Sequence, residues 1–267
     1  MSAVAVVTGA ASGIGAGLAR AAKARGMRLV LADVSAAPLR ALARELGGAT
    51  SVITDVADAA SVEALAERAY AEFGQVDLLF NNAGVMAMGN SWEIEPQRWR
   101  RAIDINLFGV LHGLRSFVPR LLAARRPARI VNTASVGGFL ASPLMAPYSA
   151  SKFAVVALSE SLRAEMELLQ APVRVSLLAP GPVRTGIFGD PAGPEASAAT
   201  RGFAAQMVAM TEQHGITPDE LARRAFAGID EDRFWLVPQP EALDEGLRAR
   251  TDGILARRTP TLPWAVN

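Results

Sequence analysis

The stretch that decides the fold is Thr8-Gly9-Ala10-Ala11-Ser12-Gly13-Ile14-Gly15, which follows an apolar run at residues 3–8 and opens a helical pattern at residues 13–25. A strand, a glycine-rich turn and a helix in this order form the context that a dinucleotide fingerprint requires. Glycine lets the backbone turn sharply and approach a pyrophosphate, and the helix N-terminus offers free N–H donors with a partial positive charge. A tight strand-to-helix turn without a ligand would have the same pattern, so the rest of the sequence must decide.

Strand-like apolar runs alternate with helical stretches along the chain. We expect strands at residues 3–8, 28–32, 51–54, 76–80, 129–133, 173–178 and 233–237. We expect helices at residues 13–25, 36–46, 61–73, 97–124 (bent near Gly109), 148–169, from 218 onward, and 241–257. Short runs that are apolar on both faces are typical of parallel strands covered by helices, and their alternation implies right-handed crossovers. The prediction is an α/β fold, a single doubly wound Rossmann domain over residues 1–267 with a parallel sheet of about seven strands.

The regular alternation stops between residues 180 and 217, where prolines and glycines mix with apolar side chains. Long irregular segments in compact domains are usually functional. We therefore expect a variable substrate loop at about residues 186–215 that closes as a lid. Thr217 and Pro218 then indicate an N-cap with proline at the first helical position.

Composition excludes several classes of protein. A chain that is 51% hydrophobic and 20% charged is ordinary for a globular protein, and a net charge of +1 argues against a dedicated nucleic-acid binder. Without cysteine there can be no disulfide and no thiolate metal site, and two histidines, His112 and His214, do not make a multi-histidine site. No run of 18 apolar residues occurs and the N-terminus has no basic region before its apolar run, so we expect no membrane span, no signal peptide and a cytoplasmic location.

Asp33 ends the second expected strand, 18 residues after Gly15. A carboxylate at this place can accept both hydroxyls of the adenosine ribose and would repel a 2′-phosphate. Neither Ser12 nor Val34 is basic, so no cation is evident for that phosphate. The predicted cofactor is NAD, although Asp33 could also simply cap the helix that follows.

Tyr148 and Lys152 are four residues apart on an expected helix, so their side chains share a face. The chain uses arginine almost everywhere, and Lys23 and Lys152 are its only lysines, which indicates that a compact ammonium is needed at position 152. A cation about 6 Å from the phenol, at an effective dielectric near 20, favours the phenolate by roughly 3 kcal/mol, or about two pKa units. We therefore expect Lys152 to bring the pKa of Tyr148 to about 8, unless the two form an ordinary surface pair.

These residues, in this order, resemble the short-chain dehydrogenase/reductase family in its subtype with TGxxxGIG and YxxxK motifs. The resemblance covers residues 1 to about 186 and is only architectural beyond Gly189. It rests on Thr8 to Gly15, Asp55-Val56, Asn81-Asn82-Ala83-Gly84, Asn106, Ser135, Tyr148-Ser149-Ala150-Ser151-Lys152 and Pro180 to Thr185.

The resemblance implies a role for each catalytic candidate. Ser135 would position the substrate oxygen, Tyr148 would exchange its proton, and Lys152 would lower the pKa of that tyrosine and hold the nicotinamide ribose. Asn106 would hold a helix irregularity and continue a proton relay, while Asn81 would tie strands together. The implied cofactor contacts are Gly9, Ser12, Gly13, Ile14, Gly15, Asp33, Asp55, Val56, Asn82, Ala83, Gly84, Tyr148, Lys152, Pro180, Gly181, Val183 and Thr185.

The candidate walls of a substrate pocket are mostly apolar, so we expect a hydrophobic secondary alcohol or ketone that exchanges a hydride with NAD(H). They are Met86, Met88, Val136, Leu140, Met145, Ile187, Phe188, Phe203 and Met207. A catalytically silent NAD-binding scaffold or sensor is the alternative, and a nucleotide-sugar epimerase would need a larger C-terminal domain. By resemblance, the two long helices expected at residues 97–124 and 148–169 pair with a second copy to give a homodimer or homotetramer.

Overall fold

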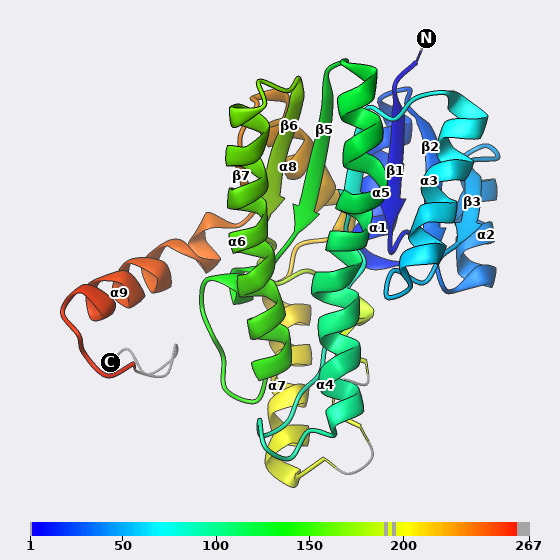
Figure 1. Ribbon diagram of the computed structural model, residues 1–267. Helices are drawn as coiled ribbons and strands as arrows, with labels where there is room; N and C mark the ends of the chain where they lie inside the picture. Colours follow the sequence, from blue (N-terminus) through cyan, green and yellow to red (C-terminus); the bar gives the residue numbers. More distant parts are fainter. Residues whose placement is uncertain (1, 190–191, 194–195, 261–267) are drawn as a thin grey trace.

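Seven parallel strands form one sheet in the order β3-β2-β1-β4-β5-β6-β7 (Figure 1). This structure is a computed structural model and describes residues 2–189, 192–193 and 196–260. The strands are β1 Val4–Thr8, β2 Arg28–Asp33, β3 Thr50–Ile53, β4 Leu78–Asn81, β5 Ala128–Thr133, β6 Val173–Leu178 and β7 Trp235–Leu236. The strand order reverses between β1 and β4, so the predicted doubly wound α/β fold is confirmed.

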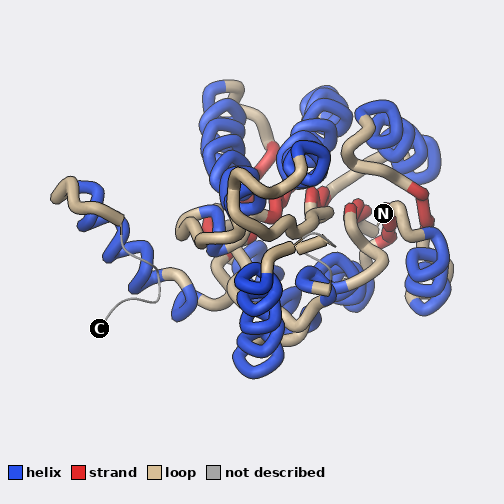
Figure 2. The backbone as a smooth tube through the Cα atoms, turned by 90° about the horizontal axis from the view of Figure 1, so that it is seen from below, coloured by secondary structure: helices blue, strands red, loops and turns tan. Residues whose placement is uncertain are grey.

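Helices cover both faces of the sheet, as Figure 2 shows in the view from below. Helices α1, α2 and α8 pack on one face, and α3, α5 and α6 on the other. Their bounds are α1 Gly13–Ala24, α2 Ala36–Glu45, α3 Ala59–Phe73, α4 Pro96–Ile103, α5 Gly109–Ala124, α6 Ala146–Leu168, α7 Ala198–His214, α8 Pro218–Asp230 and α9 Asp244–Leu255.

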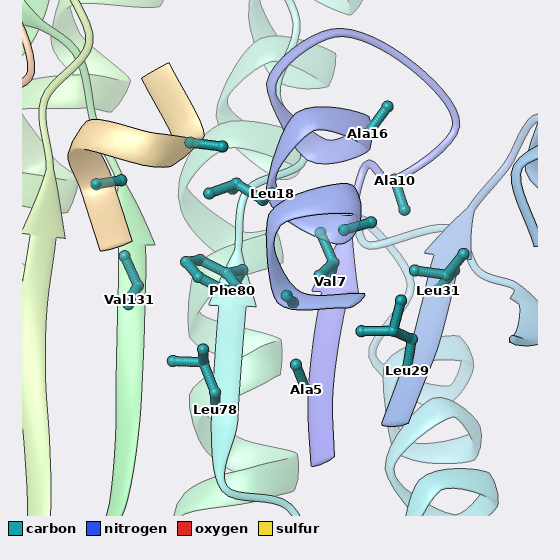
Figure 3. Packing of buried hydrophobic residues seen from close by; sticks show 14 of the residues in the cluster. Ala5, Val7, Ala10, Ala16, Leu18, Leu29, Leu31, Leu78, Phe80 and Val131 are labelled. Atoms are coloured by element: carbon teal, nitrogen blue, oxygen red, sulfur yellow. The ribbon is translucent and has the colours of Figure 1, made fainter. Parts of the chain in front are cut away.

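Strand β1 shows why the strands appear as apolar runs in the sequence. All five of its residues are buried, with Ala5 and Val7 in the core on one face and Val6 in the core on the other. Figure 3 shows Val7 and Phe80 from neighbouring strands beside Leu18 of α1. Because successive side chains of a strand point to opposite faces, a strand covered by helices on both sides has no polar face.

Local signals set several helix boundaries. The Thr217 hydroxyl accepts a hydrogen bond from the Glu220 N–H at 3.1 Å, and Pro218 occupies the first position of α8, as expected. The helix expected at residues 97–124 is divided into α4, a π-helical turn at Asp104–Phe108, and α5. The expected bend is therefore a π-helical insertion that contains Asn106, and α5 begins at Gly109.

The expectation of an irregular segment through residues 186–215 was wrong for its second half. Residues 198–214 form the 17-residue helix α7, whose N-cap Ser197 accepts a hydrogen bond from the Thr200 N–H. The prolines and glycines that suggested a loop are confined to its first half, apart from Gly202 and Gly215, and the alanine, methionine and glutamine residues of α7 are good helix formers. Figure 1 shows α7 beyond the carboxyl ends of the strands, near α4.

The C-terminal part is less regular than expected. The strand expected at residues 233–237 shortens to the two residues of β7, and the helix expected at 241–257 divides into the 3-10 turn Pro240–Ala242 and α9. Helix α9 leaves the body of the molecule at the β7 edge of the sheet (Figure 1). Across the described part of the chain, no helix has the length and apolar character needed to span a membrane.

Candidate active site

The turn between β1 and α1 depends on close backbone contacts. Gly9 and Gly13 have φ angles of 66° and 51°, in the region that favours glycine. A Cβ at Gly15 would lie 2.0 Å from the Gly9 carbonyl oxygen, so no side chain fits there. The N-cap Ser12 forms no capping hydrogen bond through its side chain, which leaves donors of the first turn of α1 available to an anion. This cradle fits a pyrophosphate.

Asp33 lies beside this turn at the end of β2. Its carboxylate accepts hydrogen bonds from the Ala11 N–H at 3.1 Å and the Ser35 N–H at 2.8 Å. The carboxylate is therefore held in place next to the glycine turn, where a ribose would follow a bound pyrophosphate. Asp55 instead accepts from the Ala57 N–H at 3.0 Å, and the N-cap of α3 is Asp58 rather than Asp55.

The two asparagines at the end of β4 both have structural partners. The Asn81 amide donates to Asn132 Oδ1 at 2.9 Å, and the Asn132 amide donates to Ser159 Oγ at 3.0 Å, so a buried polar chain ties β4 to β5 and α6. The Asn82 amide donates to the Thr8 carbonyl at 3.0 Å. Asn82 therefore links β4 to the glycine turn, a role that we had expected only of Asn81.

Tyr148 and Lys152 lie one turn apart on α6 and are almost fully buried, with exposed fractions of 7% and 3%. Lys152 Nζ lies 5.7 Å from the centre of the Tyr148 ring and donates to the Thr133 carbonyl at 2.8 Å. An added Cβ at Gly84 would come within 3.5 Å of Lys152 Nζ, so the ammonium occupies a narrow site between β4, β5 and α6. The pair is not an ordinary surface pair.

Burial controls the acid–base properties of this pair in the protein alone. Burial raises the pKa of Tyr148. The hydrogen bond with Ser135 lowers this pKa, but its effect is smaller than that of burial. Burial also lowers the pKa of Lys152 to about 8, so part of the lysine population is neutral at slightly alkaline pH. The expected lowering of the Tyr148 pKa is therefore wrong for the protein alone, because burial is the largest cause of the shift and raises the pKa.

Ser135 begins the 3-10 turn Val136–Gly138 after β5. Its hydroxyl accepts from the Gly137 N–H at 3.1 Å and donates to the Pro180 carbonyl at 3.4 Å. It is also a hydrogen-bond partner of Tyr148. Of the serines near the tyrosine, this one shares a site with the phenol, whereas the Ser149 hydroxyl faces the Ser142 N–H at 3.5 Å.

Asn106 is fully buried in the π-helical turn and bridges two parts of the site. Its Oδ1 accepts from the Val85 N–H at 2.8 Å, and its amide donates to the Val85 carbonyl and to Ser151 Oγ, each at 3.0 Å. Ser151 in turn donates to the Tyr148 carbonyl at 2.7 Å. Asn106 thus connects the segment after β4 to the helix that carries Tyr148 and Lys152. Ser151 completes this link.

Above Tyr148 lies a cluster of apolar side chains, here called the cap cluster. Buried Met88, Met145 and Ala204 pack with the tyrosine, and five partly buried residues pack against them: Met86, Ile187, Phe188, Phe203 and Met207. Met86, Met145, Phe188, Phe203 and Met207, five of the residues predicted to line a substrate pocket, therefore lie in one cluster with Tyr148. Val136 and Leu140 are not part of the cap cluster.

Residues 180–185 form the loop expected at the nicotinamide, and two elements fix it. On one side the Pro180 carbonyl accepts from the Val136 N–H at 2.9 Å. On the other side buried Gln239 donates to the Pro182 carbonyl at 2.8 Å, and its Oε1 has no partner among the described residues. Thr185 lies against the glycine turn, since a Cβ at Gly13 would be 3.1 Å from its methyl group. Sequence reasoning missed Gln239, because a single glutamine between two prolines follows no pattern.

A glycine turn, a fixed carboxylate on the next strand and a buried tyrosine–lysine pair at the carboxyl ends of a parallel sheet together define a dinucleotide-binding oxidoreductase site. No group of acidic or histidine side chains suited to a metal ion occurs in the described part of the chain.

Comparisons with known proteins agree with this class. The short chain dehydrogenase family matches residues 3–192. The 1-deoxy-11-beta-hydroxypentalenate dehydrogenase of Streptomyces avermitilis is 36% identical over 244 residues, which are 89% of this chain and 85% of that protein. The C alpha-dehydrogenase of Sphingobium sp. is 33% identical over 267 residues, 96% of this chain and 87% of that one.

A solved structure of a short-chain dehydrogenase/reductase from Burkholderia phymatum in complex with NAD has a TM-score of 0.94 and 38% identity, covering 99% of this chain and 98% of that one. The chain therefore belongs to the short-chain dehydrogenase/reductase family and is an oxidoreductase.

Proposed function

We propose that the protein transfers a hydride between NAD(H) and the carbinol carbon of a hydrophobic secondary alcohol. The observation that carries the proposal is the burial of Tyr148, with Lys152 and Ser135 beside it, beneath the apolar cap cluster. A phenol in this setting can exchange a proton with an oxygen atom while the surrounding apolar side chains exclude water. NADH production over a panel of secondary alcohols tests the proposal. No turnover with any of them would favour a catalytically silent NAD-binding protein.

Asp33 supports NAD rather than NADP. The carboxylate is fixed by two backbone donors beside the glycine turn, and a 2′-phosphate there would meet its charge. The choice needs a test, because similar structures have been solved with either cofactor, among them an alcohol dehydrogenase from Thermococcus sibiricus with 5-hydroxy-NADP. We expect NAD to be preferred by at least about tenfold in kcat/KM, which is about 1.4 kcal/mol. Comparable efficiency with both cofactors would contradict the assignment, and Asp33→Ala should reduce the preference.

The residues divide the work of alcohol oxidation. Bound NAD would supply the nicotinamide C4 that accepts the hydride. Ser135 holds the substrate oxygen by a hydrogen bond, and the Tyr148 oxygen takes the hydroxyl proton as the carbonyl forms. Lys152, in its protonated form, stabilises the phenolate that this step requires. In the reverse direction Tyr148 returns the proton to the carbonyl oxygen.

Asn106 keeps this arrangement together. It joins the segment after β4 to α6 through Val85 and Ser151, so the lysine and the tyrosine keep their places relative to the sheet. We include it in the catalytic set as the residue that continues the proton relay from Lys152.

The segment at residues 186–215 acts as a lid in this proposal. Ile187, Phe188, Phe203 and Met207 from this segment pack over Tyr148, so a substrate reaches the phenol only when they move. Flexible thioether side chains adapt to ligands of different shape. Hydrogen exchange tests the lid: amides of α7 should exchange more slowly with cofactor and substrate than in the free protein. Equally slow exchange in both states would contradict it.

We propose that α5 and α6 pair with those of a second copy. Exposed aromatic side chains lie at the start of this region, with Phe108 at the end of the π-helical turn and Trp92 before α4. They line an open groove of about 630 Å³ with Trp99 and Ile103. Such a two-fold contact is self-complementary. Light scattering that shows only a 28.1 kDa species would contradict the assembly.

A further inference from the structure

Residues 54–58, here called the β3 turn, follow strand β3 directly and lie beside Asp33. The Thr54 N–H donates to the Asp33 carbonyl at 3.0 Å, so the turn begins next to the carboxylate that would bind the adenosine ribose. In a dinucleotide the adenine base is attached to this ribose. The β3 turn is therefore the part of the chain that the base would meet at the edge of the sheet.

Most backbone donors of the β3 turn have partners within the chain. The Asp55 N–H donates to Ser61 Oγ at 3.0 Å, and the Ala57 N–H donates to Asp55 Oδ1 at 3.0 Å. The Asp58 N–H donates to the Asp55 carbonyl at 3.1 Å. The Val56 N–H and the second carboxylate oxygen of Asp55 have no hydrogen-bond partner in the part of the chain that the structure describes. One donor and one acceptor are thus left on neighbouring residues.

This pair matches the chemistry of adenine. The base has an acceptor at N1 and a donor in the adjacent 6-amino group, so the Val56 N–H could donate to the first and the Asp55 carboxylate could accept from the second. Hypoxanthine carries a carbonyl oxygen in place of the amino group and a hydrogen on N1. Its pattern is the reverse, and both contacts would be lost.

His112 on α5 holds the β3 turn. Its Nδ1 lies 2.9 Å from the Val56 carbonyl oxygen, and the side chain is half-buried. A carbonyl oxygen can only accept, so this hydrogen bond requires a hydrogen on Nδ1. The N–H of the same peptide group belongs to Ala57 and donates to the Asp55 carboxylate. This peptide group is therefore fixed at both ends, and the carboxylate is fixed with it.

Gly109 lies three residues before His112 on the same face of α5. A Cβ at this position would lie 2.8 Å from Val56 Cγ2 and 3.5 Å from the Val56 carbonyl oxygen. Val56 is itself buried, in a small cluster with Val62 and Ile105. Helix α5 thus contacts both the side chain and the carbonyl of Val56, which leaves the turn little freedom to rotate.

We infer that His112 is a positioning residue for the adenine end of the cofactor. By holding the Val56 carbonyl it keeps the Val56 N–H and the Asp55 carboxylate in the orientation that adenine requires. The inference rests on the proposed use of NAD(H). Because His112 acts through the β3 turn, it should affect the affinity for the dinucleotide and the choice of base.

Fluorescence titration with NADH and with reduced nicotinamide hypoxanthine dinucleotide measures this choice without a substrate. The wild type should bind the hypoxanthine analogue at least about tenfold more weakly than NADH. His112→Leu should bring the ratio of the two Kd values to about threefold or less, mainly by weakening NADH. His112→Asn should keep the ratio near that of the wild type, because the asparagine amide can supply the N–H in place of Nδ1.

Arg120→Leu is the matched control. It also removes a donor from α5, the guanidinium that bonds Glu63 Oε1 of α3 at 2.6 Å, but this contact does not involve the β3 turn. The control should keep the ratio of the wild type. Equal ratios in His112→Leu and the wild type, or equal losses in His112→Leu and either His112→Asn or Arg120→Leu, would overturn the inference.

Gly109→Ala tests the same contact with His112 unchanged, in case His112→Leu does not fold. The added methyl group would push against Val56, so the ratio should fall as it does in His112→Leu, and an unchanged ratio would overturn the inference. Equal binding of the two dinucleotides by the wild type would also overturn it, although NAD(H) use would stand. Absence of NADH binding to the wild type would instead contradict the proposed function, and the inference with it.

Discussion

The two sides of Tyr148 are held by different interactions. On the side of the sheet, Lys152, Asn106 and Ser151 are fixed by hydrogen bonds of 2.7 to 3.0 Å to named partners on β5, α6 and the segment after β4. On the opposite side, the cap cluster consists of methionine, phenylalanine, isoleucine and alanine side chains in contact with one another. The interactions on the first side are directional hydrogen bonds, whereas the side chains on the second side are held only by apolar packing and burial.

This difference teaches where the protein can tolerate change. A hydrogen-bonded group that loses its buried partner costs about 1–3 kcal/mol, and the geometry of proton transfer is lost with it. An apolar wall of flexible thioethers can repack around a new ligand at a lower cost. We expect the polar side to define the reaction and the cap cluster to define the substrate.

The largest effect should come from the phenol itself. Tyr148→Phe keeps the ring in the cap cluster and removes only the group that exchanges the proton, so turnover should fall by about 10²–10⁴-fold. NADH binding, followed by fluorescence titration, should remain nearly unchanged. Near-normal turnover would show that another group moves the proton.

Lys152→Arg should lower turnover by about a hundredfold even though the charge is kept. The ammonium fits between Gly84 and the Thr133 carbonyl, and the guanidinium is larger and flat. The chain offers a matched control in Lys23, its only other lysine, which is exposed on α1. Lys23→Arg should have normal steady-state kinetics. Equal loss in both variants would remove the special role of position 152.

Burial of Lys152 also predicts how stability depends on pH. Native Lys152 releases its proton near pH 8, whereas the unfolded residue does so near 10.5, so between these values the unfolded chain binds more protons. The free energy of unfolding should therefore rise with pH across this window, by at most about 3 kcal/mol. Lys152→Met should lack this rise. Denaturant unfolding of the protein without cofactor at pH 7 and pH 10 measures it, and parallel pH profiles would contradict the prediction.

Gln239→Leu should raise the KM for NAD by about tenfold with a smaller change in kcat, because the loop at residues 180–185 loses the donor to its Pro182 carbonyl. Gln75→Leu is the matched control. Gln75 is also buried and hydrogen-bonded, to Asp77, but lies at the opposite end of β4. That variant should lose stability and keep its KM. Equal KM values for both variants would make Gln239 a purely structural residue.

The smallest effect is expected on α7. Gly202 lies in this helix at an exposed position with no atom near its missing Cβ, so Gly202→Ala should stabilise the protein by about 0.5–1 kcal/mol. Gly15→Ala, whose Cβ would lie 2.0 Å from a carbonyl oxygen, should destabilise it instead. Thermal unfolding of the two variants measures their stability and so compares α7 with the glycine turn. A destabilised Gly202→Ala variant would show that α7 is as tightly constrained as that turn.

The polar side of the site was the part that could be predicted from the sequence. Its residues occur at spacings that the backbone imposes, such as the four residues between Tyr148 and Lys152 or the glycines at a turn with positive φ. The cap cluster was predicted only as a composition, since Val136 and Leu140 are equally apolar and lie outside it. Helix α7 was missed because prolines and glycines precede it.

Two other features depend on distances that no local pattern contains. Gln239 reaches Pro182 from 57 positions away in the sequence, and nothing in its neighbourhood marks it. The pKa of Tyr148 was predicted from an assumed distance of about 6 Å between a cation and the phenol. Lys152 Nζ lies 5.7 Å from the centre of the Tyr148 ring, but the degree of desolvation could not be predicted from the sequence. The sign of that pKa shift was wrong for this reason.

The two hydrogen bonds of Asp33 have a consequence for attempts to redesign coenzyme use. The same carboxylate that would repel a 2′-phosphate also fastens Ala11 of the glycine turn and Ser35 at the start of α2. Replacing it to admit NADP would loosen the turn that receives the pyrophosphate of either coenzyme. Coenzyme exchange in this enzyme is thus a folding problem as well as a charge problem, and a successful variant needs a new acceptor for the Ala11 and Ser35 amides together with the new cation.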